Sequence, residues 1–160
     1  MAMDVFLKLG DLDGESQDAK HEGSIDVLAW SWGMTQAGSA HIGGGAGSGK
    51  VAVQDVSITK FVDKASSTIL KKCCSGKHFP EAKLTIRKSG GDSPVEYYKL
   101  TMTNVFITSI STGGSGGEDR LTENVTMTME KFKTEYTPQK EDGSADAAIE
   151  ATWDILKNQE

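Results

Sequence analysis

Apolar and polar residues alternate with a period of two along most of the chain, and this pattern predicts β-strands. In the segment 5–9, the side chains of Val5, Leu7 and Leu9 fall on one face of an extended backbone. Comparable runs occupy 25–34, 51–60, 83–88, 95–111, 121–136 and 148–156. About seven strands joined by glycine-rich connections favour an antiparallel β-barrel of two packed sheets.

The phase of the alternation gives further detail in three of these runs. In 25–34 one face carries Ile25, Val27 and Ala29, and the other carries Leu28, Trp30, Trp32 and Met34. In 95–111 the apolar residues in phase are Tyr98, Leu100, Met102, Phe106 and Ile110. In 121–136 the phase changes after Met129, to Phe132 and Tyr136. Such a change predicts a bulge, or a strand that passes from one sheet to the other.

One segment, 63–77, has a helical pattern. Asp63 can accept hydrogen bonds from amides of the first turn, and Gly76 can end the helix in the left-handed conformation. The residues predicted to share one face are Ala65, Ile69, Leu70, Cys73 and Cys74. We therefore expect one short α-helix flanking the barrel, with the two cysteines as small packing residues rather than a redox or metal pair.

Length and charge limit the class of protein. A chain of 160 residues predicts a single domain, 1–160, and no apolar run approaches the roughly 20 residues of a membrane span. The segment 141–160 holds six acidic residues against Lys157, a net charge of −5 out of −6 for the whole chain. Basic residues elsewhere are scattered among acidic ones, which argues against nucleic-acid binding. The lack of a signal peptide and the two adjacent cysteines favour synthesis in a reducing cytoplasm.

Two short motifs suggest chemistry and both lack its other requirements. Gly44, Gly49 and Lys50 match the start of a phosphate-binding P-loop, but Val51 stands where the magnesium-binding hydroxyl belongs and a strand is predicted to follow. Gly113, Ser115 and Gly117 match the nucleophile elbow of serine hydrolases, but no histidine follows Ser115. The three histidines also lack metal-ligand spacing. We expect no enzyme activity, no cofactor and no metal site.

Apolar residues on both faces of a strand are a further feature, at Trp30 to Trp32 and at 105–107. A small isolated barrel normally shows a polar outer face, so something covers these positions. Either the predicted helix or further copies of the same chain can do so. A monomeric ligand-binding β-sandwich and, less favoured, a serine hydrolase using Ser115 remain the alternatives.

Four stretches together are similar to the haemolysin-coregulated protein (Hcp) family, the inner-tube subunit of the bacterial type VI secretion system. They are IDVLAWSWGMTQAGS, the loop ending GSGKV, GKHFPEAKLTIRKSGG and STGGSGGEDRLTENV, in this order after the opening MAMDVFLKLGDLDGES. The resemblance covers nearly the whole chain.

The resemblance implies a two-sheet barrel that forms hexameric rings, which stack into a phage-tail-like tube inside a sheath and below a spike. It also implies secretion into the medium or neighbouring cells without a signal peptide, and effector proteins carried in the lumen. Under this interpretation Ser31 and Ser115 line the lumen and bind effectors. Gly43, Gly44, Gly45, Gly47, Gly49 and Lys50 form a contact loop between subunits or rings.

Overall fold

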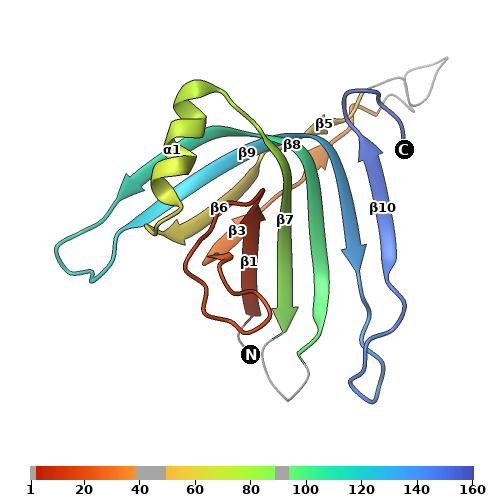
Figure 1. Ribbon diagram of the computed structural model, residues 1–160. Helices are drawn as coiled ribbons and strands as arrows, with labels where there is room; N and C mark the ends of the chain where they lie inside the picture. Colours follow the sequence, from red (N-terminus) through yellow and green to blue (C-terminus); the bar gives the residue numbers. More distant parts are fainter. Residues whose placement is uncertain (1–2, 39–49, 89–93) are drawn as a thin grey trace.

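The computed structural model describes residues 3–38, 50–88 and 94–160, and these residues form a strongly curled antiparallel sheet with one flanking helix (Figure 1). The first strands are β1 (Met3–Leu9), β2 (Ile25–Asp26), β3 (Ala29–Ser31), β4 (Met34–Thr35), β5 (Ala52–Val53) and β6 (Val56–Phe61). The helix α1 (Ser66–Ser75) follows, and then β7 (Phe79–Lys88), β8 (Glu96–Gly113), β9 (Thr122–Tyr136) and β10 (Ile149–Asp154).

The main sheet has the strand order β2-β1-β7-β8-β9-β6-β3. The strand β10 also pairs with β9, at residues 131–136, whereas β6 pairs with residues 122–127 of β9. The strands at the two ends of this order belong to one stretch of chain. Ile25 pairs with Leu7 of β1, whereas Trp30 pairs with Ile58 of β6. The stretch 25–31 therefore joins the two edges of the curled sheet. The mostly β fold, with barrel-like curvature and one short helix, confirms the expectation from the sequence.

A crease crosses the two longest strands, β8 and β9, and divides the sheet into two arms. On β8 the buried side chains change from Leu100 and Met102 to Val105 and Ile107, so the core-facing phase shifts at Asn104. Asn104 has a positive φ of 52°, and its Nδ2 donates a hydrogen bond of 2.5 Å to Oε2 of Glu130 on β9. The buried phase of β9 changes at the same level. The phase change predicted in 121–136 is thus confirmed. A matching change on β8 lies at the same level, and the two together form the crease.

Two sequence-based phase assignments are wrong, for related reasons. Phe106 was expected in phase with Leu100, but it is 40% exposed because the left-handed backbone at Asn104 turns the next side chains over. Ala29 was expected with Ile25 and Val27, yet it is exposed. There the chain changes partner, from β1 to β6, and its inward phase changes with it.

The helix α1 ends as expected, at Gly76 with φ of 68°, whose amide donates to the carbonyl of Lys72. Asp63 accepts a hydrogen bond of 3.0 Å from the amide of Ala65, just before the first helical residue. Ile69 is fully buried and packs the helix on the core, whereas Leu70 is 52% exposed. Cys73 is half-buried and Cys74 is exposed. The predicted apolar face was therefore too wide, because residues 70 and 74 lie 100° round the helix from 69 and 73.

The hydrophobic core fills the inside of the curl and is closed at one end by α1. Its fully buried members come from both arms. They include Leu7, Leu9, Ile25, Ile58, Leu84, Leu100, Met102, Val125 and Met127. Because the core occupies the concave side, each arm presents its other face outward, and the chemistry of these two faces differs.

Candidate functional site

Small polar side chains form most of the outward face of one arm. We call this the hydroxyl arm: β3, β6, residues 105–113 of β8 and residues 122–129 of β9. Cross-strand register aligns two rows on its outward face. One row is Ser31, Ser57, Thr126 and Ser109, and the other is Ala29, Thr59, Asn124 and Ser111. All eight are exposed or half-buried. The face therefore offers hydroxyl and amide groups without a charged side chain in either row.

Several of these side chains hydrogen-bond to one another along the surface. Thr59 Oγ1 donates to Asn124 Oδ1 at 2.7 Å, and Thr126 Oγ1 lies 2.5 Å from the hydroxyl of Ser109. Thr108, the extra residue at the irregularity in β8, lies 2.7 Å from Thr126 and donates to Asp55 at 2.6 Å. Such cross-strand hydrogen bonds fix the positions of these side chains and stabilise the pairing of the strands.

Of the two residues expected to line a lumen, Ser31 belongs to this arm and Ser115 lies in the connection from β8 to β9 at the end of the arm. Ser31 is exposed at the end of a row, while Trp30 and Trp32 on either side of it pack against the core. Ser115 is exposed in the hairpin between β8 and β9, which projects from the body of the molecule at the left of Figure 1. The structure therefore places the two serines in different elements, one in β3 and the other in this hairpin connection.

The glycine-rich contact loop falls mostly outside the described residues, which exclude Gly43, Gly44, Gly45, Gly47 and Gly49. Lys50 is described and is exposed, two residues before the short strand β5. The residues that follow form β5 and β6, so the strand predicted after Lys50 is confirmed. A P-loop requires a helix at this position to direct its amides at phosphates.

A buried ion cluster fixes α1 to the base of the hydroxyl arm. Lys60 and Glu123 point inward from paired positions on β6 and β9, and their side chains are 0% and 2% exposed. The Lys60 ammonium forms ion pairs with Glu123 and, at 3.0 Å, with Asp63. Ser66, the first residue of α1, donates to Glu123 at 2.6 Å. Hydrogen bonds satisfy the charges, so the cluster binds helix, β6 and β9 together.

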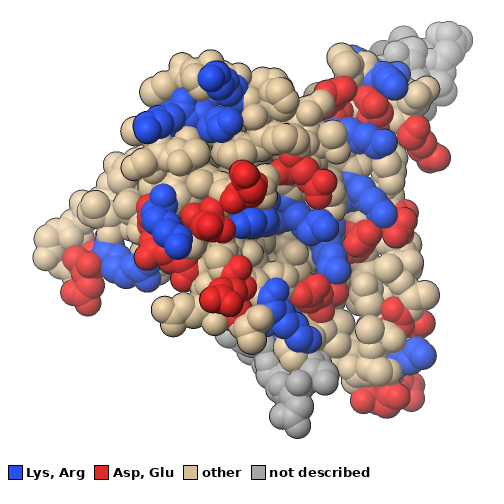
Figure 2. All heavy atoms as spheres, in the orientation of Figure 1, with Lys and Arg blue, Asp and Glu red and all other residues tan. Residues whose placement is uncertain are grey.

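The outward face of the other arm is charged. This charged arm consists of β1, β7, residues 96–103 of β8, residues 131–136 of β9, and β10. One cross-strand row on it reads Lys8, Lys83, Thr101, Lys133 and Thr152. Lys133 pairs with Glu135 at 3.1 Å and Glu150 at 3.4 Å, and the hydrogen bonds that its ammonium donates to these carboxylates raise the pKa of Lys133. Figure 2 shows acidic and basic side chains intermingled over β1 and β7.

A strap, residues 10–24, is fastened to the charged arm by side chains. Arg87 of β7 donates to Asp18 of the strap and to Asp4 of β1, at 2.5 and 2.9 Å. The hydrogen bond from Arg87 lowers the pKa of Asp18 well below its usual range. His21 stacks on Phe6 and pairs with Glu96 at 2.5 Å. Burial opposes the charge of Glu96, but hydrogen bonds from His21 and Lys99 outweigh it and lower the pKa of Glu96.

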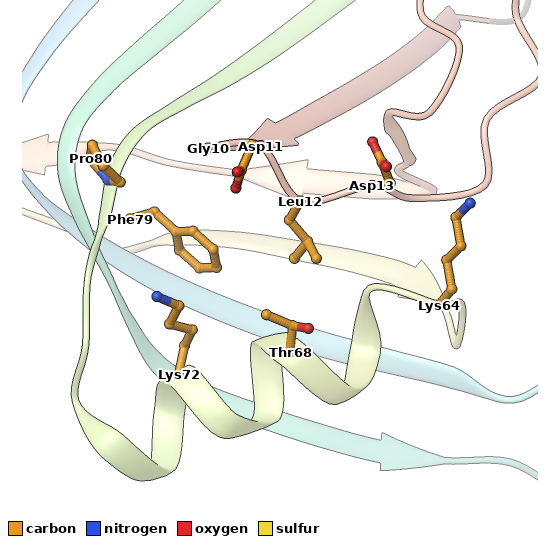
Figure 3. A pocket seen from close by; sticks show the side chains of 9 residues that line it. All are labelled: Gly10, Asp11, Leu12, Asp13, Lys64, Thr68, Lys72, Phe79 and Pro80. Carbon is orange, nitrogen blue, oxygen red and sulfur yellow. The ribbon is translucent and has the colours of Figure 1, made fainter.

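A cleft of roughly 730 Å³ lies between α1 and the start of this strap (Figure 3). Lys64, Thr68 and Lys72 face it from α1 and the turn before it, and Asp11 and Asp13 face it from the strap. Lys72 lies 4.9 Å above the ring of Phe79, which contributes to the floor. Charges of both signs therefore meet in this cleft, and it contains none of the residues expected to be functional.

The positions of the histidines bear on the possible chemistry. His21 is bound in the strap, and His78 packs beside Phe106 with ring centroids 5.4 Å apart. Neither hydrogen-bonds to Ser115. Within the described residues there is no group of three histidine, cysteine or acidic side chains placed to hold a metal ion. No helix in that part of the chain has the length and apolar character to cross a bilayer.

Sequence reasoning named Ser31 and Ser115, which stay predictions, and it missed the hydroxyl rows between the strands. A signal was present, because Ser57 and Thr59, Asn124 and Thr126, and Ser109 and Ser111 each recur with period two. Only the strand register shows that these pairs lie side by side. The buried Lys60 and Glu123 were also missed, since charged residues in a strand ordinarily indicate an exposed face.

Comparison with known proteins agrees with this fold. The family profile described as "Type VI secretion system effector, Hcp" matches residues 6–136. The chain is 55% identical to Protein hcp1 of Pseudomonas aeruginosa over 159 residues, which cover 99% of this chain and 98% of that one. The chain belongs to the Hcp family of type VI secretion proteins.

Solved structures place this Hcp family member among proteins of the same fold. A structure described as a type six secretion system protein has a TM-score of 0.91 at 31% identity, over 99% of both chains. Hcp1 from Salmonella typhimurium has a TM-score of 0.81 at 38% identity, also over 99% of both chains. The resemblance noted in the sequence is therefore confirmed, and the Hcp fold includes both arms and the helix.

Proposed function

We propose that this chain is the tube subunit of a type VI secretion system. Six copies associate head to tail into a ring, rings stack into a tube within the sheath and below the spike, and effector proteins travel in the lumen. The subunit is made in the cytoplasm and exported with the tube. No catalytic step belongs to this role, in which Ser115 contacts a client rather than attacks a substrate.

The observation that carries the proposal is the contrast between the two outward faces. A lumen wall must hold a client weakly and release it, and small hydroxyl groups offer hydrogen bonds without a large apolar anchor. The two hydroxyl rows suit such a wall, and the same rows repeated around a ring supply avidity from weak contacts. The charged arm, by contrast, suits surfaces in contact with water or protein partners.

Exposed apolar side chains support association between copies. Leu28 is 50% exposed, Phe106 40% and Ile149 64%, although each lies in or beside a regular strand. Together with open strand edges at β10 and β3, these side chains are typical of a subunit that buries them against a neighbour. A specific contact of this kind buries on the order of 800 Å² on each partner. We assign the glycine-rich loop and Lys50 to contacts between subunits or rings.

Light scattering and electron microscopy of the purified chain test the assembly. Ring-sized particles are the expected result at tens of micromolar, and a 17.1 kDa monomer would contradict the proposal and favour a ligand-binding module. The lumen assignment is tested with Ser31→Gln and Ser115→Gln, against Ser67→Gln on the exposed side of α1 as a matched control. The lumen variants should keep the ring and lower the level of a co-expressed effector, and unchanged effector levels would remove these serines from the lumen wall.

A further inference from the structure

Two charged patches of opposite sign lie at opposite ends of the molecule. We define the helix patch as Leu70, Lys71, Cys74 and Lys77, on and just after α1. We define the tail patch as Tyr136, Glu141, Asp142, Asp146 and Ile149, at the connection from β9 to β10. Figure 1 shows α1 at the upper left and this connection at the lower right. Figure 2 shows basic side chains gathered over α1 without acidic ones among them.

The charged side chains of both patches form no ion pairs with other described residues of the same subunit. No carboxylate in residues 3–38, 50–88 and 94–160 lies within ion-pair distance of Lys71 or Lys77. The same ranges contain no ion pair for Glu141 or Asp146, whereas Glu150 nearby pairs with Lys133. Hydrogen bonds from Ser144 lower the pKa of Asp142, so that carboxylate stays charged.

Each patch also has an apolar centre. Leu70 is 52% exposed, and Cys74, one turn further along α1, is exposed beside it. In the tail patch Tyr136 and Ile149 are cross-strand partners, 46% and 64% exposed. Around these centres the helix patch carries lysines, and the tail patch carries three acidic residues beside the exposed Lys140, for a net negative charge. An apolar centre with a charged rim is typical of a protein contact surface.

We propose that neighbouring copies in the ring meet through these patches, the helix patch of one against the tail patch of the next. This inference rests on the proposed function and adds the surfaces by which the ring closes. A second copy is the occupant because it supplies both the opposite charge and a matching apolar centre. Patches at opposite ends of one subunit make a head-to-tail contact, which differs from a two-fold dimer contact and gives a ring when the rotation between successive copies closes.

Charge reversal tests the pairing. Lys71→Glu with Lys77→Glu should raise the protein concentration needed for half-assembly at least about tenfold, because like charges then face each other. Glu141→Lys with Asp146→Lys should do the same. Lys20→Glu with Lys83→Glu is the matched control, since both lysines are exposed, lie outside the patches and change the net charge equally. Sedimentation at fixed ionic strength measures each assembly.

Mixing gives the decisive result. In an equal mixture of the two reversed variants, every helix patch can face a tail patch of opposite sign if the copies alternate, and a six-membered ring closes with alternating copies. The mixture should therefore form rings although neither variant does alone. Rings that survive reversal in a single variant would overturn this inference and leave the helix patch to another protein. A monomeric unmodified chain would instead overturn the proposed function, and this contact with it.

Discussion

The same two strands, β8 and β9, run through both arms, yet their outward faces differ. Before the crease β8 presents Lys99 and Thr101 outward, and after it Ser109 and Ser111. In the hydroxyl arm the charged residues that exist, Lys60 and Glu123, are turned inward and paired. In the charged arm they are turned outward. The comparison teaches that one continuous sheet can carry two unrelated surfaces when its inward phase changes at a crease.

Replacing one lysine in each arm compares an inward-facing charge with an outward-facing one. The inward replacement should cause the largest loss of unfolding free energy. Lys60→Met leaves the carboxylates of Asp63 and Glu123 buried without their cation, which should cost about 3–5 kcal/mol of unfolding free energy. Lys133→Met removes an outward partner of Glu135 and Glu150 and should have only a small effect. Urea unfolding at one protein concentration measures both variants, because assembly itself shifts the midpoint. Equal losses would show that burial does not distinguish the two lysines.

The crease itself can be broken at Asn104. Asn104→Ala removes the hydrogen bond to Glu130 and forces alanine into a left-handed backbone, for a loss of about 1–2 kcal/mol. Asn104→Gly removes the same hydrogen bond but accepts the positive φ, so its loss should be smaller. The difference between the two variants in urea isolates the backbone strain. If glycine costs as much as alanine, the side-chain hydrogen bond rather than the backbone holds the crease.

Local pattern predicted most of the strands and the helix, and it failed where the chain changes partner or phase. The apolar run 105–107 fits either face, so only the positive φ of Asn104 decides which residues point inward. The exposure of Ala29 depends likewise on a switch from β1 to β6. Of the candidate site, single positions such as Ser31 could be named from the sequence. The rows could not be predicted, because each row is made of residues on strands that are far apart in the chain.

The strap on the charged arm should make part of the stability depend on pH. Arg87 lowers the pKa of Asp18 in the folded chain, so this pair stabilises the fold above the unfolded pKa of about 3.9. Its contribution is lost as pH falls through the lower, folded pKa. Asp18→Asn should therefore reduce the thermal midpoint at pH 7, and the difference from the unmodified chain should shrink below about pH 4. A difference that persists unchanged in acid would show that Asp18 acts through its shape rather than its charge.

The smallest effect is expected on the hydroxyl face. Ser57 lies in the middle of a row, between Ser31 and Thr126, and its side chain is only half-buried. Ser57→Ala removes a hydroxyl without opening a cavity, so the unfolding free energy should change by no more than about 0.5 kcal/mol.

Thr126→Ala is the matched comparison. Thr126 bonds to both Thr108 and Ser109, so this variant should lose about 1 kcal/mol of unfolding free energy. Urea unfolding distinguishes the two. A loss at Ser57 as large as at Thr126 would mean that the row is needed to hold the strands together. If Ser57→Ala leaves the unfolding free energy unchanged, the Ser57 hydroxyl serves the surface presented to a neighbour or client rather than the stability of the fold.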